Sequence, residues 1–139
     1  MNQHIYLEHA NITVNDLQEA LKFFQTAFPH FKVRGGGNDL REWVHLGDDH
    51  TYIALNQAKN TAFKVEKNYD GPGINHIGFV VPNVQEIANN LLQAGYKRDY
   101  PKETEKYRIR DYFADADGNQ YEFVQYLSEL PEEKNKYGK

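Results

Sequence analysis

The stretch His9-Ala-Asn-Ile-Thr-Val-Asn-Asp-Leu-Gln-Glu-Ala-Leu21 decides the fold, because it recurs 67 residues later as His76-Ile-Gly-Phe-Val-Val-Pro-Asn-Val-Gln-Glu-Ile-Ala88. Both copies begin with alternating apolar residues, which predict a strand, and continue with the three-to-four-residue apolar spacing of a helix. Asp16 and Asn83 precede these helices, and each has a Glu three residues on, which is the spacing of a capping box. A matched His and a matched cap in register predict a duplicated strand-helix unit.

Three further strands are predicted after each helix, because apolar segments continue there between turns that contain Gly and Asp. The predicted strands are 31–34, 41–46 and 51–56 in the first half, and 96–100, 107–114 and 119–126 in the second. Gly35-Gly36-Gly37 indicates a flexible hairpin loop, and Gly95 is expected to end the second helix. The sequence therefore predicts an α+β fold of two related βαβββ modules.

The whole chain, 1–139, is expected to form a single domain in which the two modules occupy 5–56 and 74–126. The stretch 57–73 contains a Gly-Pro-Gly sequence and indicates a linker between the modules, and 127–139 is a charged tail.

Composition excludes several classes of protein. The chain has no Cys, so disulfides, thiolate nucleophiles and Cys-based zinc sites are excluded. The net charge of −4 and the absence of a basic stripe exclude a nucleic-acid partner. No segment approaches ~18 consecutive apolar residues, and the N-terminus lacks the pattern of a signal peptide. We therefore expect no membrane partner and, by default, a cytoplasmic location.

The polar residues of the strands are expected to gather on one face of each sheet. Strand side chains alternate between faces, and the apolar set of each module should pack on that module's helix. His9, His76 and Glu122 then lie on the opposite face. A buried carboxylate without a partner is costly, and a divalent cation supplies that partner. Two imidazoles and one carboxylate also leave coordination positions open for a substrate, so we expect one metal ion here.

Alternatives to this metal site stay open. A single His on a strand is more often a hydrogen-bonded structural residue than a ligand, and a Glu on a last strand usually belongs to a solvated face or an ion pair. The same positions can also line a metal-free pocket. His45, on the strand that carries Trp43, is a rival ligand or a residue that lines the cleft.

Strand alternation assigns further residues to the substrate-binding side. These candidates are Asn11, Trp43, His45, Tyr52, Asn56, Asp111 and Phe113. Arg41, Arg108 and Arg110 are candidates for binding an anionic substrate group, because a guanidinium can hold a carboxylate or phosphate through two hydrogen bonds.

At these residues the sequence resembles the vicinal oxygen chelate superfamily, which includes glyoxalase I, fosfomycin-resistance transferases, extradiol dioxygenases and bleomycin-resistance proteins. The resemblance covers roughly residues 5–126 and is carried by HANITVNDL from His9, NHIGFVV from Asn75 and DADGNQYEFV from Asp115. The last is the most specific, because an Asp-x-Asp-Gly turn is followed four residues after the Gly by Glu122. The resemblance implies a curved mixed sheet around a cleft, a small-molecule substrate and a homodimer.

The superfamily's usual metal ligands lie on the first and last strands of each module, which implies His9, His76 and Glu122 here. The fourth position falls at Ala54, which cannot coordinate a metal. A three-ligand set resembles the fosfomycin-resistance transferases or the dioxygenases more than glyoxalase I, although the fosfomycin enzymes have a Thr where this chain has Asn11.

The function implied by the resemblance is that of a metal-dependent lyase or isomerase, transferase or dioxygenase. Glu122 is the candidate catalytic residue, and Fe, Mn, Ni or Zn are the candidate ions, with the ion's identity open. The alternative is a metal-free protein that binds small molecules in the manner of bleomycin-resistance proteins.

Overall fold

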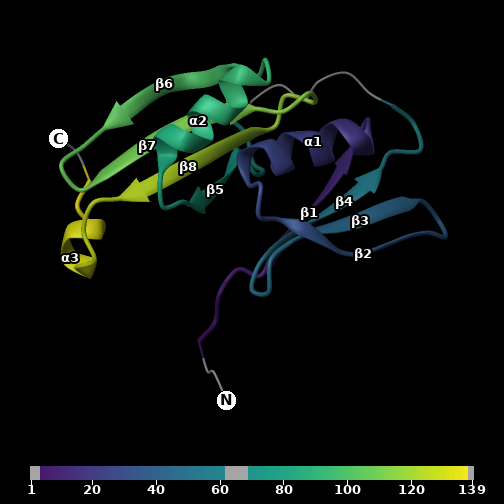
Figure 1. The fold of residues 1–139 in the computed structure, drawn as a ribbon, viewed down its shortest axis with the longest axis horizontal. Coiled ribbons are helices and arrows are strands. Elements are labelled where there is room, and N and C mark those ends of the chain that lie inside the picture. The colour runs from purple at the N-terminus through teal and green to yellow at the C-terminus, as the bar shows by residue number, and fades with distance from the viewer. Residues whose placement is uncertain (1–3, 62–68, 138–139) are drawn as a thin grey trace. The chain divides into compact units, whose positions relative to one another are not determined.

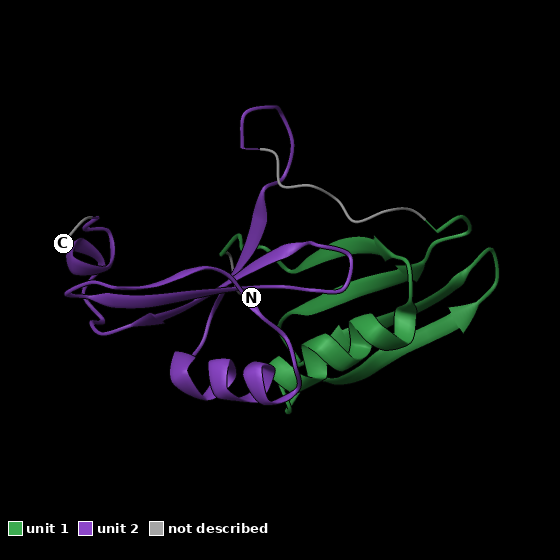
Figure 2. Cartoon of the chain, turned by 90° about the horizontal axis from the view of Figure 1, so that it is seen from above, with its two compact units in different colours: residues 1–63 green, residues 64–139 purple. Residues whose placement is uncertain are grey.

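The computed structural model describes residues 4–61 and 69–137 of the chain. The chain divides into two compact units, Met1–Phe63 and Lys64–Lys139, which Figure 2 shows in green and purple. Each unit contains one βαβββ module, so the predicted duplication is confirmed (Figure 1). The boundary between the units falls inside the predicted linker, of which residues 62–68 lie outside the described residues.

The first unit is a four-stranded mixed sheet with one helix. Its elements are β1 (His9–Val14), α1 (Leu17–Ala27), β2 (Lys32–Asn38), β3 (Glu42–Gly47) and β4 (Tyr52–Gln57). The strand order is β1-β4-β3-β2. The β1–β4 pair is parallel and the other two pairs are antiparallel. The first strand therefore lies beside the last one, and their residues share a face.

The second unit repeats this topology. Its elements are β5 (His76–Val80), α2 (Val84–Gln93), β6 (Arg98–Thr104), β7 (Arg108–Ala114), β8 (Gln120–Tyr126) and α3 (Pro131–Lys134). The strand order is β5-β8-β7-β6, with β5 parallel to β8. The short helix α3 lies in the charged tail. Among the described helices, none combines the length and the apolar character that a membrane span requires.

Local signals at the helix ends act as the sequence predicts. The Asp16 carboxylate accepts hydrogen bonds from the backbone amides of the first turn of α1, and the Asn83 side chain does the same for α2. Gly95 has a φ of +93° directly after the C-cap of α2. The Tyr96 amide then donates to the Leu91 carbonyl at 3.0 Å, which closes the helix in a Schellman turn.

The core of each unit lies between its helix and one face of its sheet. Helix α1 buries Leu17, Ala20, Phe23, Phe24 and Ala27, and α2 buries Val84, Ile87, Ala88 and Leu91. The strands contribute Ile53 and Leu55 in the first unit, and Tyr121 and Phe123 in the second, all at most 2% exposed. Each helix lies along one face of its own strands (Figure 2). The opposite face of each sheet is therefore free for polar residues.

The expectation of a hairpin loop at Gly35–Gly37 is wrong. Strand β2 continues through these glycines and pairs with residues 43–45 of β3. A Cβ atom on Gly37 would lie 3.0 Å from Nε1 of Trp43, and one on Gly36 would lie 3.0 Å from the Trp43 carbonyl oxygen. The glycines are therefore needed because the strand passes close to the indole, and not because the chain turns there.

In each unit, one glutamine of the last strand binds the first amide of the helix through its side chain. The Gln57 side-chain oxygen accepts from the Leu17 amide, and the Gln125 oxygen accepts from the Val84 amide, both at 2.9 Å. Each satisfies the first amide of a helix, which has no partner within the helix. The two modules therefore also share a contact between the last strand and the start of the helix, which the repeated stretches 9–21 and 76–88 did not reveal.

Two aspartates organise equivalent turns before the last strands. The Asp48 carboxylate accepts from the amides of His50 and Thr51 at 2.9 and 3.0 Å. The Asp115 carboxylate accepts from the Asp117 and Asn119 amides at 3.0 and 2.9 Å. The Asp-x-Asp-Gly motif is thus a structural turn that directs the chain into β8.

Candidate metal and substrate site

The open face of the second sheet brings His76 and Glu122 together. Strand register pairs Gly78 and Tyr112 with Glu122, and His76 with Gln120, so these residues share the face that points away from α2. The distance from His76 Nε2 to Glu122 Oε1 is 3.7 Å. The two side chains are 33% and 15% exposed, so they lie at the surface of the face without being fully solvated.

Glu122 is held in place by its neighbours. The Tyr112 side chain lies opposite Glu122 on the neighbouring strand, and burial, together with the interaction with the Glu122 carboxylate, raises the pKa of Tyr112 well above its ordinary value. A Cβ atom on Gly78 would lie only 3.7 Å from Glu122 Oε2, so the carboxylate extends over bare backbone. Tyr112 and Gly78 therefore flank Glu122 on the neighbouring strands.

The His76–Glu122 pair fits a divalent ion. At 3.7 Å the two atoms are too far apart for a hydrogen bond with each other. Two ligands that each lie ~2.1 Å from one ion are roughly 3.0–3.4 Å apart, which a small side-chain rotation reaches from here. His76 Nδ1 is buried and has no hydrogen-bond partner among the described residues. Within either unit, no three described His, Asp or Glu side chains gather closely enough to hold an ion alone.

His9 lies on the open face of the first sheet and is oriented there by two neighbours. Its ring stacks on Tyr52 with centroids 4.6 Å apart and planes 12° from parallel. Its Nδ1 lies 2.9 Å from Glu8 Oε1. A histidine that donates Nδ1–H to a carboxylate presents the lone pair of Nε2, which is the arrangement that metal-binding histidines generally have.

The other candidates from the first sheet share the face of His9. Register places Asn11, Trp43, His45, Tyr52 and Asn56 on this side. The His45 ring stacks on Tyr52 at 4.7 Å and lies 4.9 Å from the Trp43 ring, and the Asn56 amide donates to Asn11. This face is therefore a row of aromatic rings beside a pair of amides.

The expectation that Asp111 and Phe113 line the substrate side is wrong. Register pairs them with Phe123 and Tyr121, so they face α2, and both are fully buried. The Asp111 carboxylate is held by two hydrogen bonds from Nε and Nη2 of Arg98, each about 3.0 Å. A charged residue on the core side of β7 is tolerated because a neighbouring strand supplies its partner, and the local pattern of β7 does not reveal that partner.

The arginines of β7 are already occupied by carboxylates. Arg110 donates to Glu103 at 2.8 Å and also to Glu105. Arg108 lies 3.4 Å from Glu105, whose pKa is lowered because the charges of Arg110 and Arg108 outweigh the effect of burial. Arg108 and Arg110 therefore serve an internal ion-pair network and do not present free guanidinium groups to a substrate.

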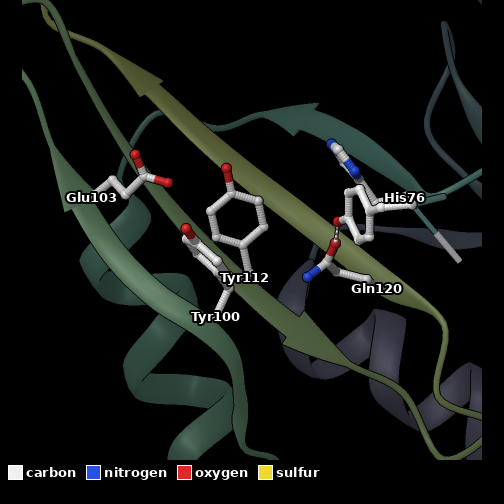
Figure 3. Close-up of a pocket in the computed structure, with 6 residues that line it drawn as sticks. His76, Tyr100, Glu103, Tyr112 and Gln120 are labelled. Atoms are coloured by element: carbon white, nitrogen blue, oxygen red, sulfur yellow. Dashed lines mark hydrogen bonds between the residues drawn. The ribbon is translucent and has the colours of Figure 1, made fainter. Parts of the chain in front are cut away.

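A pocket of about 400 Å³ lies on the open face of the second unit. It is lined by Tyr69, His76, Tyr100, Glu103, Tyr112 and Gln120. Figure 3 shows Tyr100 and Tyr112 between Glu103 on one side and His76 and Gln120 on the other. Of the lining residues, sequence reasoning had assigned only His76 to the site. The register of β7 against β8, which places Tyr112 opposite Glu122, is the signal that would have found the central tyrosine.

Comparison with known proteins agrees with this architecture. A model of the Glyoxalase/Bleomycin resistance protein/Dioxygenase superfamily matches residues 6–123. The chain belongs to this superfamily. A search of the curated proteins found no match. Membership therefore accounts for the fold and for the repeated modules, and the reaction has to be argued from the residues.

Solved structures of superfamily members share the fold at low sequence identity. A glyoxylase/bleomycin resistance protein/dioxygenase domain from Frankia sp. EAN1pec has a TM-score of 0.74 and 18% identity, covering 89% of this chain and 99% of that chain. A glyoxalase family protein from Bacillus cereus has a TM-score of 0.72 and 16% identity, covering 91% and 97%. A variant of the fosfomycin resistance protein FosX from Listeria monocytogenes, complexed with Mn(II) and 1S,2S-dihydroxypropylphosphonic acid, has a TM-score of 0.71 and 20% identity, covering 98% and 100%.

Proposed function

We propose that this chain is a divalent-metal-dependent enzyme acting on a small substrate that binds through adjacent oxygen atoms. The observation that carries the proposal is the His76–Glu122 pair, 3.7 Å apart beside a pocket and at a spacing suited to one ion. His9 is the proposed third ligand, and its contact with Glu8 supports this role. When bound, the metal would supply Lewis-acid stabilisation of negative charge that develops on a substrate oxygen.

The chain's own residues have separate tasks in this proposal. Tyr112 orients Glu122, and Glu8 holds His9 in the tautomer that leaves Nε2 available. Ala54 takes the place of a fourth ligand, so no second carboxylate is available at that position to move a proton. This departure favours addition or oxygen chemistry, as in a transferase or dioxygenase, over a glyoxalase I type of isomerisation. The Mn(II) in the FosX structure makes Mn(II) the first ion to test.

The ligand assignment is tested with the full chain after chelator treatment and dialysis. Titration with Mn(II), followed by calorimetry and electron paramagnetic resonance, should show one ion per chain. His76→Ala should weaken binding roughly 100-fold or more, because it removes a ligand from a small set. His50→Ala is the matched control, since this exposed imidazole lies in the turn before β4 and should leave affinity unchanged. Less than about 0.2 ions per chain in the reconstituted wild type would refute the proposal.

The aromatic row on the first sheet favours a second candidate function, the binding of planar molecules without metal. Trp43 and Tyr52 lie on either side of His45 in this row, and both remain partly exposed. The chain contains one Trp, so the fluorescence of Trp43 reports on this face alone. Saturable quenching by a planar aromatic ligand, in a protein that binds no Mn(II), would establish this function in place of the enzyme.

The assembly implied by the resemblance is also a proposal. We propose that residues 1–139 act as one domain and that two chains form a homodimer. Light scattering at micromolar concentration should give twice the chain mass of 16.2 kDa. A mass equal to that of one chain would refute the dimer.

A further inference from the structure

The walls of the pocket on the second unit are mainly aromatic. The rings of Tyr100 and Tyr112 lie 5.3 Å apart at 70°, so they form two walls of a corner. His76 packs against Tyr112 at 6.2 Å in an edge-to-face arrangement. Tyr69 closes another side, where its hydroxyl donates to Gln120. Such a corner accommodates a flat ring or a compact apolar group by contact with aromatic faces.

The charge in this pocket is negative. Glu103 is the carboxylate among the lining residues, and its side chain is 34% exposed. One of its oxygens accepts a hydrogen bond from Nη2 of Arg110, and the same nitrogen also donates to Glu105. No Lys or Arg lines the pocket in the described part of the chain. Glu122 lies beside His76 outside this lining, and in the proposed function its charge is taken up by the metal ion, so Glu103 supplies the negative charge available to a substrate.

A cation and an anion would meet opposite conditions here. A cation over tyrosine faces is attracted by the ring electrons, and a carboxylate at the same place strengthens that attraction. An anion would lose water and find no cationic side chain among the lining residues, because the nearby Arg110 is already engaged by Glu103 and Glu105, which makes its burial unfavourable. The arrangement in Figure 3 places Glu103 and His76 at opposite ends of the tyrosine corner.

We propose that this pocket selects substrates with a flat aromatic body and a positively charged amine, with the amine at Glu103, and discriminates against anionic groups there. The inference rests on the proposed function, because it assigns the His76–Glu122 end to the oxygen atoms of the same substrate. It names a substrate class, aromatic amines, that differs from the phosphonate bound in the FosX structure.

Three probes that share a phenyl ring and differ in charge test this selectivity: benzylamine, benzyl alcohol and benzenesulfonate. Sulfonate is chosen because it is a weak ligand for divalent ions. Each is titrated into the full chain by calorimetry. Changes in the NMR chemical shifts of the Glu103 and Tyr112 backbone amides then show whether the probe binds in this pocket. Benzylamine should bind about tenfold more tightly than benzenesulfonate, with benzyl alcohol between them. Equal or tighter binding of benzenesulfonate overturns the proposal.

Glu103→Gln tests the residue assigned to the amine. It removes the carboxylate and frees Arg110, so benzylamine affinity should fall about tenfold while benzenesulfonate affinity rises. Glu132→Gln on α3 is the matched control, because Glu132 is exposed and does not line the pocket. Tyr100→Leu should weaken benzylamine severalfold more than benzyl alcohol, and it supplies a second test if Glu103→Gln does not fold. An unchanged ratio between the probes in both variants overturns the proposal.

The outcome is separable from that of the proposed enzyme function. The same titrations are run on chelator-treated protein and on protein loaded with Mn(II), and Mn(II) affinity is measured on the same samples. Selectivity for benzylamine without Mn(II) binding would support the proposed amine-selective pocket and refute the proposed metal-dependent enzyme function. Mn(II) binding without selectivity would keep the metal site and refute the amine pocket.

Discussion

The two modules share their framework and differ in their open faces. Asp48 and Asp115 organise equivalent turns, and Gln57 and Gln125 bind the first amide of each helix. The constraints that keep a sheet attached to its helix have therefore been retained in both halves. They act on the core side and in the turns, where a change exposes unpaired backbone groups.

On the open faces the equivalent positions carry different chemistry. Ala54 of β4 corresponds to Glu122 of β8, because His45 and Tyr112 pair with them in the same register. The first face is a row of stacked rings, whereas the second holds a carboxylate, a tyrosine and a pocket. Residues on such a face lie outside the core between helix and sheet, so they can differ between the modules without changing that core. The comparison supports the proposal that the functional site lies on the face that the framework does not use.

The largest predicted difference between the modules concerns the turn aspartates. Asp115 is 6% exposed and also accepts hydrogen bonds from the side chains of Asn119 and Tyr121. Asp115→Ala would leave several donors unpaired in a buried place and should cost about 3–4 kcal/mol of unfolding free energy. Asp48→Ala removes two backbone hydrogen bonds at an exposed turn and should cost about 1 kcal/mol.

Urea unfolding of the two variants against the wild type measures this difference. Asp49→Ala, at an exposed position in the first turn, is a control that should change stability by less than about 0.5 kcal/mol. Equal costs for Asp48→Ala and Asp115→Ala would show that burial does not distinguish the two turns.

The fold was predictable from sequence because its signals are local and occur twice. The caps at Asp16 and Asn83, the helix end at Gly95 and the four buried residues of α2 follow from short-range patterns. The loop at Gly35–Gly37 was predicted incorrectly because glycine has two uses, turning the chain and allowing close approach. Only the pairing of β2 with Trp43 distinguishes them.

The site was predictable only where the strand pattern is unambiguous. Alternation on the strands that carry His9, Tyr52, His76 and Glu122 identified their faces correctly. It failed for Asp111, because β7 carries polar residues on both faces and the pairing with Arg98 depends on a neighbouring strand. Tyr112 and Glu103 were missed for the same reason. Their importance comes from contacts between strands that sequence alternation does not specify.

The second prediction concerns Glu8, whose carboxylate contacts His9 Nδ1, whereas His76 Nδ1 has no hydrogen-bond partner among the described residues. Glu8→Ala removes the carboxylate 2.9 Å from His9 Nδ1 and should weaken Mn(II) binding about tenfold, because the imidazole loses its fixed tautomer and orientation. Glu8→Gln keeps a hydrogen-bond acceptor and should therefore lose less Mn(II) affinity than Glu8→Ala. Calorimetric titration with Mn(II) measures both. Glu19→Ala on the exposed side of α1 is the control, and a Glu8→Ala affinity equal to that control would exclude the supporting role.

The third prediction tests whether the shared glutamine contact is equivalent in the two modules. Gln57→Leu and Gln125→Leu each remove an acceptor for the first helix amide and should cost about 1 kcal/mol. Chemical unfolding should give a somewhat larger cost for Gln57→Leu, by up to about 1 kcal/mol, because the Gln57 amide also donates to the Asn15 carbonyl at 2.7 Å. Gln18→Leu, at an exposed position of α1, controls for the change of residue type. A cost confined to one module would show that the contact is used in that module alone.

The smallest predicted effect is a difference in pH dependence between the turn aspartates. Backbone hydrogen bonds from His50 and Thr51 lower the pKa of Asp48 below its ordinary value of 3.8, whereas burial raises that of Asp115 despite its hydrogen bonds. Asp48 therefore adds stability above pH 3.8 that is lost as pH falls through its folded pKa. Asp115 does the opposite, since the part of its contribution that is linked to protonation is full below pH 3.8 and is lost as pH rises through its folded pKa, while its hydrogen bonds remain. Between about pH 3 and 6, the stability of the wild type relative to Asp48→Asn should rise with pH, and relative to Asp115→Asn it should fall. Slopes of the same sign would mean that the two turns, alike in backbone, are also alike in electrostatic environment.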